Sequence, residues 1–292
     1  MKISADVVYF LQEAEFQSMA ERIRNFVINA FRPANRGFSR LIQRNASLAS
    51  SGKSVAAFRR PLVLAPHFDD ELMGAGGTLL FLSAQGAQIT VCFITDGSGG
   101  FRGGLTREEL VIERKRENAI VSRELGYKSI CMDYEDGALQ SRIDSAKESV
   151  LEVVRRVQPD VLFCPFFFDH HADHRAAALI AVSALLNGGF HNLPLLCYMV
   201  GAPIPPQYVN AAIDISEFVG RKRELLYVYS SQTEMGFHRV LDYNLYNGII
   251  YLRKRRPAEI FHRTDALRYD GLIRKFLSSL SRRHFEQIPI LY

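Results

Sequence analysis

Residues 61–71 read PLVLAPHFDDE, and this stretch decides the expected fold. Its first six residues form an uninterrupted apolar run, which is typical of a strand buried on both faces of a parallel sheet. Further apolar runs alternate along the chain with stretches of helical composition; they lie at 89–97, 129–134, 160–166 and 193–200. Strands that alternate with helices favour right-handed βαβ units. We therefore expect an α/β fold, a Rossmann-like sandwich with a mostly parallel sheet flanked by helices.

Polar side chains are concentrated directly after two of these strands. Residues 66–71 (PHFDDE) follow the first strand, and residues 169–174 (DHHADH) follow the fourth. Ligands bind beyond the carboxyl ends of the strands in open sheets of this kind, so both clusters are expected at that edge. Crowding such groups away from water is costly unless a cation pairs with them. The two clusters therefore predict a metal site.

The residue types indicate which metal and which chemistry. Imidazole and carboxylate ligands suit Zn²⁺ or a similar first-row metal such as Fe²⁺. His67, Asp70 and His174 would supply three protein ligands and leave a position for water. Asp69 lies next to a ligand and is the candidate general base. His171 is placed to stabilise a developing oxyanion or to protonate a leaving amine.

These motifs resemble those of a known family. PHFDDE and HADH (171–174) are similar to the (A/P)HPDDE and HPDH motifs of the PIG-L/LmbE family of zinc-dependent N-acetylglucosaminyl deacetylases. The resemblance covers about residues 60–235, and weaker matches support it; they are ITDGSGG (94–100), RKRE (114–117), MDYEDG (132–137) and KRELLYVYSSQ (222–232). It implies a Rossmann-like α/β fold, the same three metal ligands and the same base.

The resemblance also implies roles for four further residues. His171 corresponds to the family's electrostatic or acid residue, and Asp173 to a residue that orients a histidine. Arg114 and Asp136 correspond to contacts with the sugar. The implied reaction is hydrolysis of an acetamide on an N-acetylglucosaminyl conjugate, which releases acetate and a free amine.

The chain departs from the family pattern at two positions. Phe68 and Ala172 stand where the family has proline, and proline would hold the preceding residue extended. Neither change removes a ligand. We expect Phe68 to narrow the pocket or to pack against a face of the sugar.

Two other functions stay open at this point. A metal-dependent phosphoesterase uses similar histidine and aspartate clusters, although two-metal sites usually need more bridging carboxylates. A non-catalytic module that binds a sugar or glycolipid would keep the fold, but it would not need Asp69.

The flanking segments differ from the motif-bearing core. Residues 1–58 are expected to form an N-terminal helical extension and linker, and residues 59–292 the deacetylase-like domain. A helix is predicted over 5–31, followed by arginines at four-residue steps; they are Arg32, Arg36, Arg40 and Arg44. A solvated face against the main domain is the favoured interpretation, with peripheral membrane contact as the alternative.

Composition limits the partners and the compartment. The formal net charge of +5 is too small for a dedicated nucleic-acid binder, and it leaves an anionic or lipid-linked sugar open. No apolar run approaches the roughly 18 residues of a membrane span, and the N-terminus lacks a signal-peptide pattern. The four cysteines form no CxxC pair and are expected to be reduced. We expect a cytoplasmic protein, and the oligomeric state is left undetermined.

Overall fold

A computed structural model describes residues 55–100 and 104–285 of the chain. The helix predicted over 5–31 and the arginine-rich stretch after it lie outside these residues. The boundary expected near residue 58 therefore stays a prediction.

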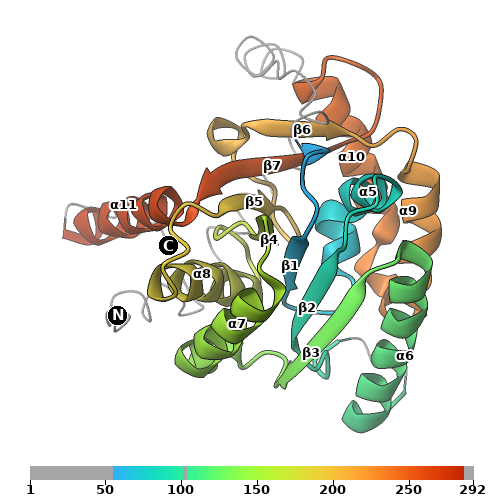
Figure 1. Ribbon diagram of the computed structural model, residues 1–292, viewed down its shortest axis with the longest axis horizontal. Helices are drawn as coiled ribbons and strands as arrows, with labels where there is room; N and C mark the ends of the chain where they lie inside the picture. Colours follow the sequence, from blue (N-terminus) through green and yellow to red (C-terminus); the bar gives the residue numbers. More distant parts are fainter. Residues whose placement is uncertain (1–54, 101–103, 286–292) are drawn as a thin grey trace, which may run out of the picture.

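Helices and strands alternate through most of the described chain (Figure 1). The first part contains β1 (Pro61–Ala65), α5 (Asp70–Ala84), β2 (Thr90–Thr95), α6 (Arg107–Leu125), β3 (Lys128–Tyr134), α7 (Ile143–Val157), β4 (Val161–Pro165) and α8 (Ala172–Asn187). The second part contains β5 (Pro194–Tyr198), β6 (Ala211–Asp214), α9 (Val219–Leu226), α10 (Phe237–Tyr251), β7 (Ala258–Asp265) and α11 (Ala266–Phe285).

In the described chain the strands form one sheet of seven, in the order β3-β2-β1-β4-β5-β7-β6. β1 pairs in parallel with both β2 and β4, and β5 continues the parallel part beside β4. β7 runs antiparallel to its two neighbours, β5 and β6. The predicted α/β fold with a mostly parallel sheet is confirmed. β2 and β4 lie on opposite sides of β1, so the strand order reverses at β1. Folds of this kind bind ligands beyond the carboxyl ends of the strands at such a reversal point.

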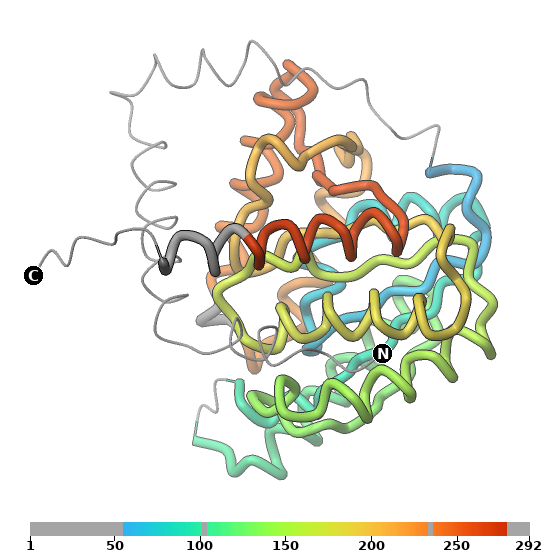
Figure 2. Tube along the Cα trace, turned by 90° about the vertical axis from the view of Figure 1, so that its left-hand side faces the viewer, coloured from blue at the N-terminus to red at the C-terminus, as the bar shows by residue number. Residues whose placement is uncertain are grey.

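Both faces of the sheet are covered by helices. α7, α8 and α11 lie in one layer, which Figure 2 shows side by side, while α5, α6 and α9 cover the other face. Alternate residues of β1 serve the two layers: Leu62 and Leu64 belong to the core under α7 and α8, and Val63 and Ala65 to the core under α5. A strand buried on both sides has no polar alternation, which explains its continuous apolar sequence.

α5 packs unusually close to the sheet because it is rich in glycine. A Cβ atom on Gly74 would overlap the ring of Tyr198, and one on Gly77 would lie 2.7 Å from Ile215. A buried ion pair between Lys222 on α9 and Glu259 on β7, 2.7 Å apart, lies beside the same helix, and Lys222 also donates to the carbonyl oxygen of Met73 on α5. The carboxylate of Glu259 also accepts hydrogen bonds from the backbone N–H groups of Gly77 and of the next residue. These contacts fix the helix that begins at the first polar cluster.

Among the described residues, no helix is both long and apolar enough to cross a bilayer. All four cysteines lie among these residues and none forms a disulfide.

Candidate active site

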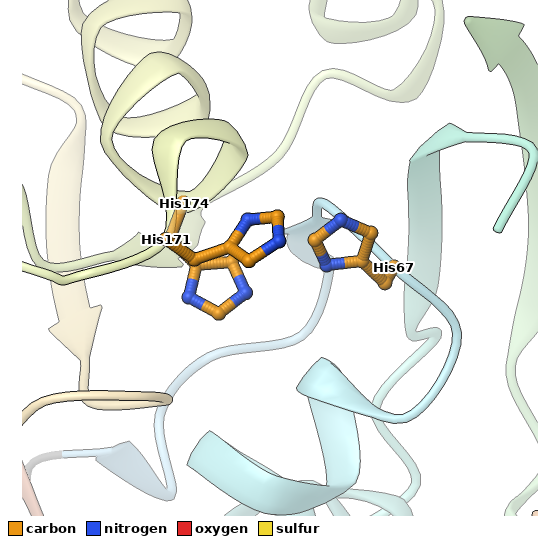
Figure 3. Close-up of side chains that lie close together, drawn as sticks. All are labelled: His67, His171 and His174. Carbon is orange, nitrogen blue, oxygen red and sulfur yellow. The ribbon is translucent and has the colours of Figure 1, made fainter. Parts of the chain in front are cut away.

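The two polar clusters meet because β1 and β4 are adjacent strands. We call residues 66–71 the β1 turn and residues 166–174 the β4 turn. Nitrogen atoms of His67, His171 and His174 all lie within 4.8 Å of one another. Figure 3 shows the ring of His67 facing the other two rings from the opposite side. The sequence prediction that both clusters share one edge of the sheet is confirmed.

Asp70 links the two turns. One carboxylate oxygen lies 3.2 Å from Nδ1 of His67, and the other lies 3.5 Å from Nε2 of His174. The first oxygen also accepts a hydrogen bond of 2.9 Å from the backbone N–H of His67, which holds the carboxylate in place. The structure thus brings together the three residues predicted as metal ligands.

The electrostatics of this group suit a cation. Burial alone would lower the pKa of His67, but Asp136, Asp173 and Asp70 around it raise the pKa well above its usual value. Burial would likewise raise the pKa of Asp70, yet His174 and His67 outweigh it and the pKa lies below the ordinary range. The site therefore favours the charged forms of both groups, the protonated imidazole of His67 and the carboxylate of Asp70. Two imidazole nitrogens and a carboxylate oxygen at this spacing fit a first-row divalent metal.

The far nitrogen of His67 is held by two carboxylates. Nε2 lies 3.2 Å from Asp136 and 3.3 Å from Asp173. Asp173 is fixed in turn by the N–H groups of Gly137 and Leu139 at 2.7 and 3.1 Å. This geometry suits the predicted role of Asp173 as an orienting residue, and it directs Nδ1 of His67 toward Asp70. The predicted contact between Asp136 and a sugar stays a prediction.

Asp69, the predicted base, has a backbone conformation that L residues rarely adopt, with φ 109° and ψ −27°. It is 3% exposed, and its carboxylate lies 3.5 Å from Nη2 of Arg114. Burial, together with the negative charge of Asp70, raises the pKa of Asp69 to about 7 although Arg114 opposes the rise. A carboxylate with a pKa near neutrality is suited to accept a proton.

His171 caps the N-terminus of α8. Its backbone is extended, and Nδ1 of the ring accepts a hydrogen bond of 3.2 Å from the N–H of Asp173. Burial and the neighbouring imidazoles of His174 and His67 lower the pKa of His171 to about 4. The ring is therefore neutral at neutral pH. Because Nδ1 is an acceptor, Nε2 carries the proton and can donate a hydrogen bond.

Arg114 and Phe68, both predicted to contact substrate, are buried behind the β1 turn. Arg114 donates to the carbonyl oxygens of Phe68 and Gly97, so it supports the backbone of this turn. The ring of Phe68 is 0% exposed and packs on Phe93 at a centroid distance of 4.6 Å. The predicted contacts of both residues with a sugar stay predictions. Because the ring of Phe68 is fully buried, the structure counts against a contact between this ring and the sugar.

Asp169 is a site residue to which the sequence analysis gave no role. Its carboxylate lies 3.1 Å from Nδ1 of His174 and accepts hydrogen bonds from the N–H groups of His171, Gly201 and Ala202. It therefore orients His174 and ties the loop after β5 to the β4 turn. Its place directly after the strand was visible in the sequence, but the direction of its side chain was not.

Glu71 was also missed. It is fully buried, and burial raises its pKa to about 8. Its carboxylate accepts hydrogen bonds from the hydroxyl groups of Tyr229 and Tyr127 and from the N–H of Asp69. The only available signal was its place as the last acid of PHFDDE.

The fold and the site define an α/β protein with a histidine–aspartate centre at the carboxyl ends of two adjacent parallel strands. Residues 62–185 match the PIG-L family, described as GlcNAc-PI de-N-acetylase. The resemblance drawn from the motifs is confirmed.

Individual proteins resemble this chain in sequence or in fold. The chain is 27% identical over 190 residues to a diacetylchitobiose deacetylase from Thermococcus kodakarensis, which covers 60% of this chain and 70% of that protein. It resembles the structure of N,N'-diacetylchitobiose deacetylase from Pyrococcus horikoshii with a TM-score of 0.64 at 23% identity, over 73% of this chain and 86% of that one. It also resembles the structure of 4-carboxy-2-hydroxymuconate hydratase from Pseudomonas putida, with a TM-score of 0.59 at 19% identity. The match covers 70% of this chain and 96% of the hydratase chain. The two structural likenesses show the fold alone, since one fold serves a deacetylase and a hydratase.

Proposed function

We propose that this chain is a metal-dependent hydrolase that removes the acetyl group from an N-acetylated amino sugar, with release of acetate and a free amine. The observation that carries the proposal is the convergence of His67, Asp70 and His174, with the carboxylate of Asp69 beside them. The match to the PIG-L family and the deacetylase relative support the substrate class.

The donor set favours Zn²⁺, with Fe²⁺ as the alternative. Nδ1 of His67, the carboxylate of Asp70 and Nε2 of His174 would hold the ion. A divalent metal in such a site supplies Lewis acidity and makes a water molecule easier to deprotonate.

Asp69 is the group that accepts the proton from the attacking water. Its pKa of about 7 lets it take a proton near neutral pH and release it later in the cycle. The guanidinium of Arg114 keeps the carboxylate in position from the side of α6. The same carboxyl group can then return the proton to the departing nitrogen, as the balance of the hydrolysis requires.

His171 is the group that stabilises the carbonyl oxygen as it becomes negative. Its ring is a neutral hydrogen-bond donor through Nε2, because the N–H of Asp173 occupies Nδ1. A fixed donor aimed at developing charge needs no reorganisation during the reaction. The low pKa favours this electrostatic role over the alternative in which His171 protonates the leaving amine.

The experiment measures acetate released by the zinc-loaded protein from N-acetylglucosamine conjugates. The panel contains a neutral glycoside, a disaccharide, a diphosphate-linked sugar and a lipid-linked sugar. Release by the wild type is expected to fall about 10²- to 10⁴-fold in Asp69→Asn, as loss of a general base predicts. Faster turnover of the last two substrates would support the anionic or lipid-linked class, which stays a prediction, as does a cytoplasmic location.

Two results would contradict the proposal. One is absence of acetate release from every conjugate although the protein retains one equivalent of metal. The other is hydrolysis of phosphate esters that depends on Asp69 while the acetamides stay intact, which would establish the phosphoesterase alternative.

A further inference from the structure

We propose that Glu71, Tyr229 and Tyr127 are positioning residues that hold the backbone of Asp69 in its left-handed conformation and thereby aim the base. This inference rests on the proposed function, since it assigns these residues to the proton-accepting carboxylate. They contact Asp69 or one another and need no contact with the substrate.

The first step is the conformation itself. Asp69 has φ 109°, in the region that favours glycine, so its Cβ crowds the neighbouring backbone. A residue persists in such a conformation only where surrounding contacts over-determine it. The direction of the Asp69 carboxylate depends on this dihedral, because the Cα–Cβ bond rotates with it.

The second step is the set of contacts on the two peptide groups of Asp69. Its carbonyl oxygen accepts hydrogen bonds from the N–H groups of Leu72 and Met73 at 3.0 and 2.9 Å. Its own N–H donates to Oε2 of Glu71 at 3.1 Å. The first pair is the normal start of a helix, but the N–H bond to Glu71 is specific to this turn. Two side chains therefore hold the peptide on the N-terminal side of Asp69: Glu71 accepts from its N–H group, and Arg114 donates to its carbonyl oxygen, that of Phe68.

The third step is what holds Glu71. Its other oxygen, Oε1, accepts hydrogen bonds from the hydroxyl of Tyr229 at 2.8 Å and from that of Tyr127 at 3.2 Å. The hydroxyl of Tyr127 has one proton, which it shares between Glu71 and the side-chain oxygen of Asn118 on α6, 2.8 Å away. Glu71 and Tyr229 are both 0% exposed, so water does not compete for these bonds.

The fourth step explains why Tyr229 is a firm anchor. It begins a segment whose next two residues bind Glu117 on α6: Ser230 through its hydroxyl, and Ser231 through its N–H and hydroxyl, at 2.7 to 2.9 Å. The path from α6 to Asp69 thus begins with the part-buried hydrogen bonds of Glu117 and continues through the buried ones from Tyr229 to Glu71 and from Asp69 to Glu71. It gives a physical role to the Tyr-x-Ser-Gln pattern at 229–232.

The test compares Tyr229→Phe with Tyr269→Phe, both in the full-length zinc-loaded protein. Tyr269 is a matched control: it is also fully buried, but its hydroxyl accepts a 2.7 Å hydrogen bond from the N–H of Phe167, at the start of the β4 turn, and has no part in the contacts of the β1 turn. Tyr229→Phe is expected to lower kcat about 10- to 100-fold, the effect of a small misplacement of a reacting group, with KM and zinc content unchanged. Tyr269→Phe should lower the melting temperature by a similar amount and leave kcat within about twofold.

Repeating the change without the base gives the decisive comparison. In an Asp69→Asn background, Tyr229→Phe should cause no further loss of kcat, because its effect passes through the Asp69 carboxylate. Equal losses of kcat in Tyr229→Phe and Tyr269→Phe, or an undiminished loss in the Asp69→Asn background, would overturn the inference.

A readout without catalysis separates this inference from the proposed function. If the wild type releases no acetate, the proposed function fails, and melting temperatures then decide. Asp69→Gly adopts a positive φ without help, so Tyr229→Phe should lower the melting temperature less in that background than in the wild type. An equal lowering in both backgrounds would show that the network does not hold this conformation.

Discussion

The β1 turn and the β4 turn carry similar residues but are built in different ways. The β1 turn contains a residue at φ 109°, and side chains from α6 and from the segment after α9 hold it. The β4 turn places His171 at φ −81° and ψ 131°, an ordinary conformation for the residue that caps a helix. Strain of the first kind costs about 1–3 kcal/mol, whereas a helix cap is favourable. The comparison teaches that the base requires imposed geometry, while the residues of the second turn are placed by the start of a helix.

Removal of Asp70, the link between the turns, is expected to have the largest effect. Asp70→Ala deletes the only carboxylate that approaches both His67 and His174 among the described residues. The protein should lose bound metal on dialysis and fall to background acetate release, checked by elemental analysis and the acetate assay. Asp144→Ala, at a carboxylate 78% exposed on α7, is the control and should keep both. Full metal retention by Asp70→Ala would show that the turns bind the ion without their link.

The next largest effect concerns the helix that follows the β1 turn. Lys222→Met leaves Glu259 buried without its cation and should destabilise the protein by about 3–5 kcal/mol in urea unfolding. Adding Glu259→Gln to Lys222→Met should recover part of this loss, since the unpaired charge is then removed. A loss below about 1 kcal/mol would mean that the ion pair does not anchor α5.

Asp169→Asn tests the β4 turn at its orienting carboxylate. The variant weakens the hold on Nδ1 of His174 while it keeps the shape of the side chain. Metal affinity or activity should fall about 10- to 100-fold, the usual effect of losing an orienting partner. Metal titration by calorimetry measures it, with Asp160→Asn near β1 as a distant control. An unchanged affinity would mean that the helix cap alone orients His174.

The smallest effect is a pH dependence behind the β4 turn. Burial lowers the pKa of His262, although its hydrogen bond to the carbonyl of Tyr208 partly opposes this, and its ring contacts Phe166. The unfolded chain, with a pKa near 6.5, binds this proton more readily than the folded one, so stability is complete above that pH and is lost as the pH falls through the folded pKa. His262→Gln should reduce the loss of unfolding free energy between about pH 7 and pH 5. His191→Gln, a change at an exposed histidine, is the control and should leave the loss of unfolding free energy unchanged. An equal loss in both variants would show that His262 does not cause it.

Much of the fold was predictable because its core elements have local signatures. The apolar runs at 61–66 and 160–166 coincide with β1 and β4, and the stretches of helical composition between such runs correspond to helices such as α6, which Gly126 caps. β6 and β7 were not predicted. β7 reads AEIFHRTD, in which only the first four residues are buried, and its antiparallel pairing depends on strands distant in sequence.

The candidate site divides in the same way. The ligand set was predictable because its members stand in two short motifs after strands that parallel pairing brings together. Tyr229 stands 158 residues from Glu71, so only the folded chain reveals their hydrogen bond. Phe68 was expected to line the pocket, but its ring is buried in the core. The next residue, Asp69, has a positive φ, which the sequence did not indicate.

The position of β7 sets an order of events during synthesis. Within the described part of the chain, β6 is the edge strand of the sheet and pairs with β7 alone, yet β7 follows it in the chain with two α-helices between them. As the chain leaves the ribosome from its N-terminus, β6 must wait without a partner until residues 258–265 have emerged. Until then the edge of β5 is also open to other strands. A nascent chain stalled before residue 258 would therefore be the form most in need of a chaperone.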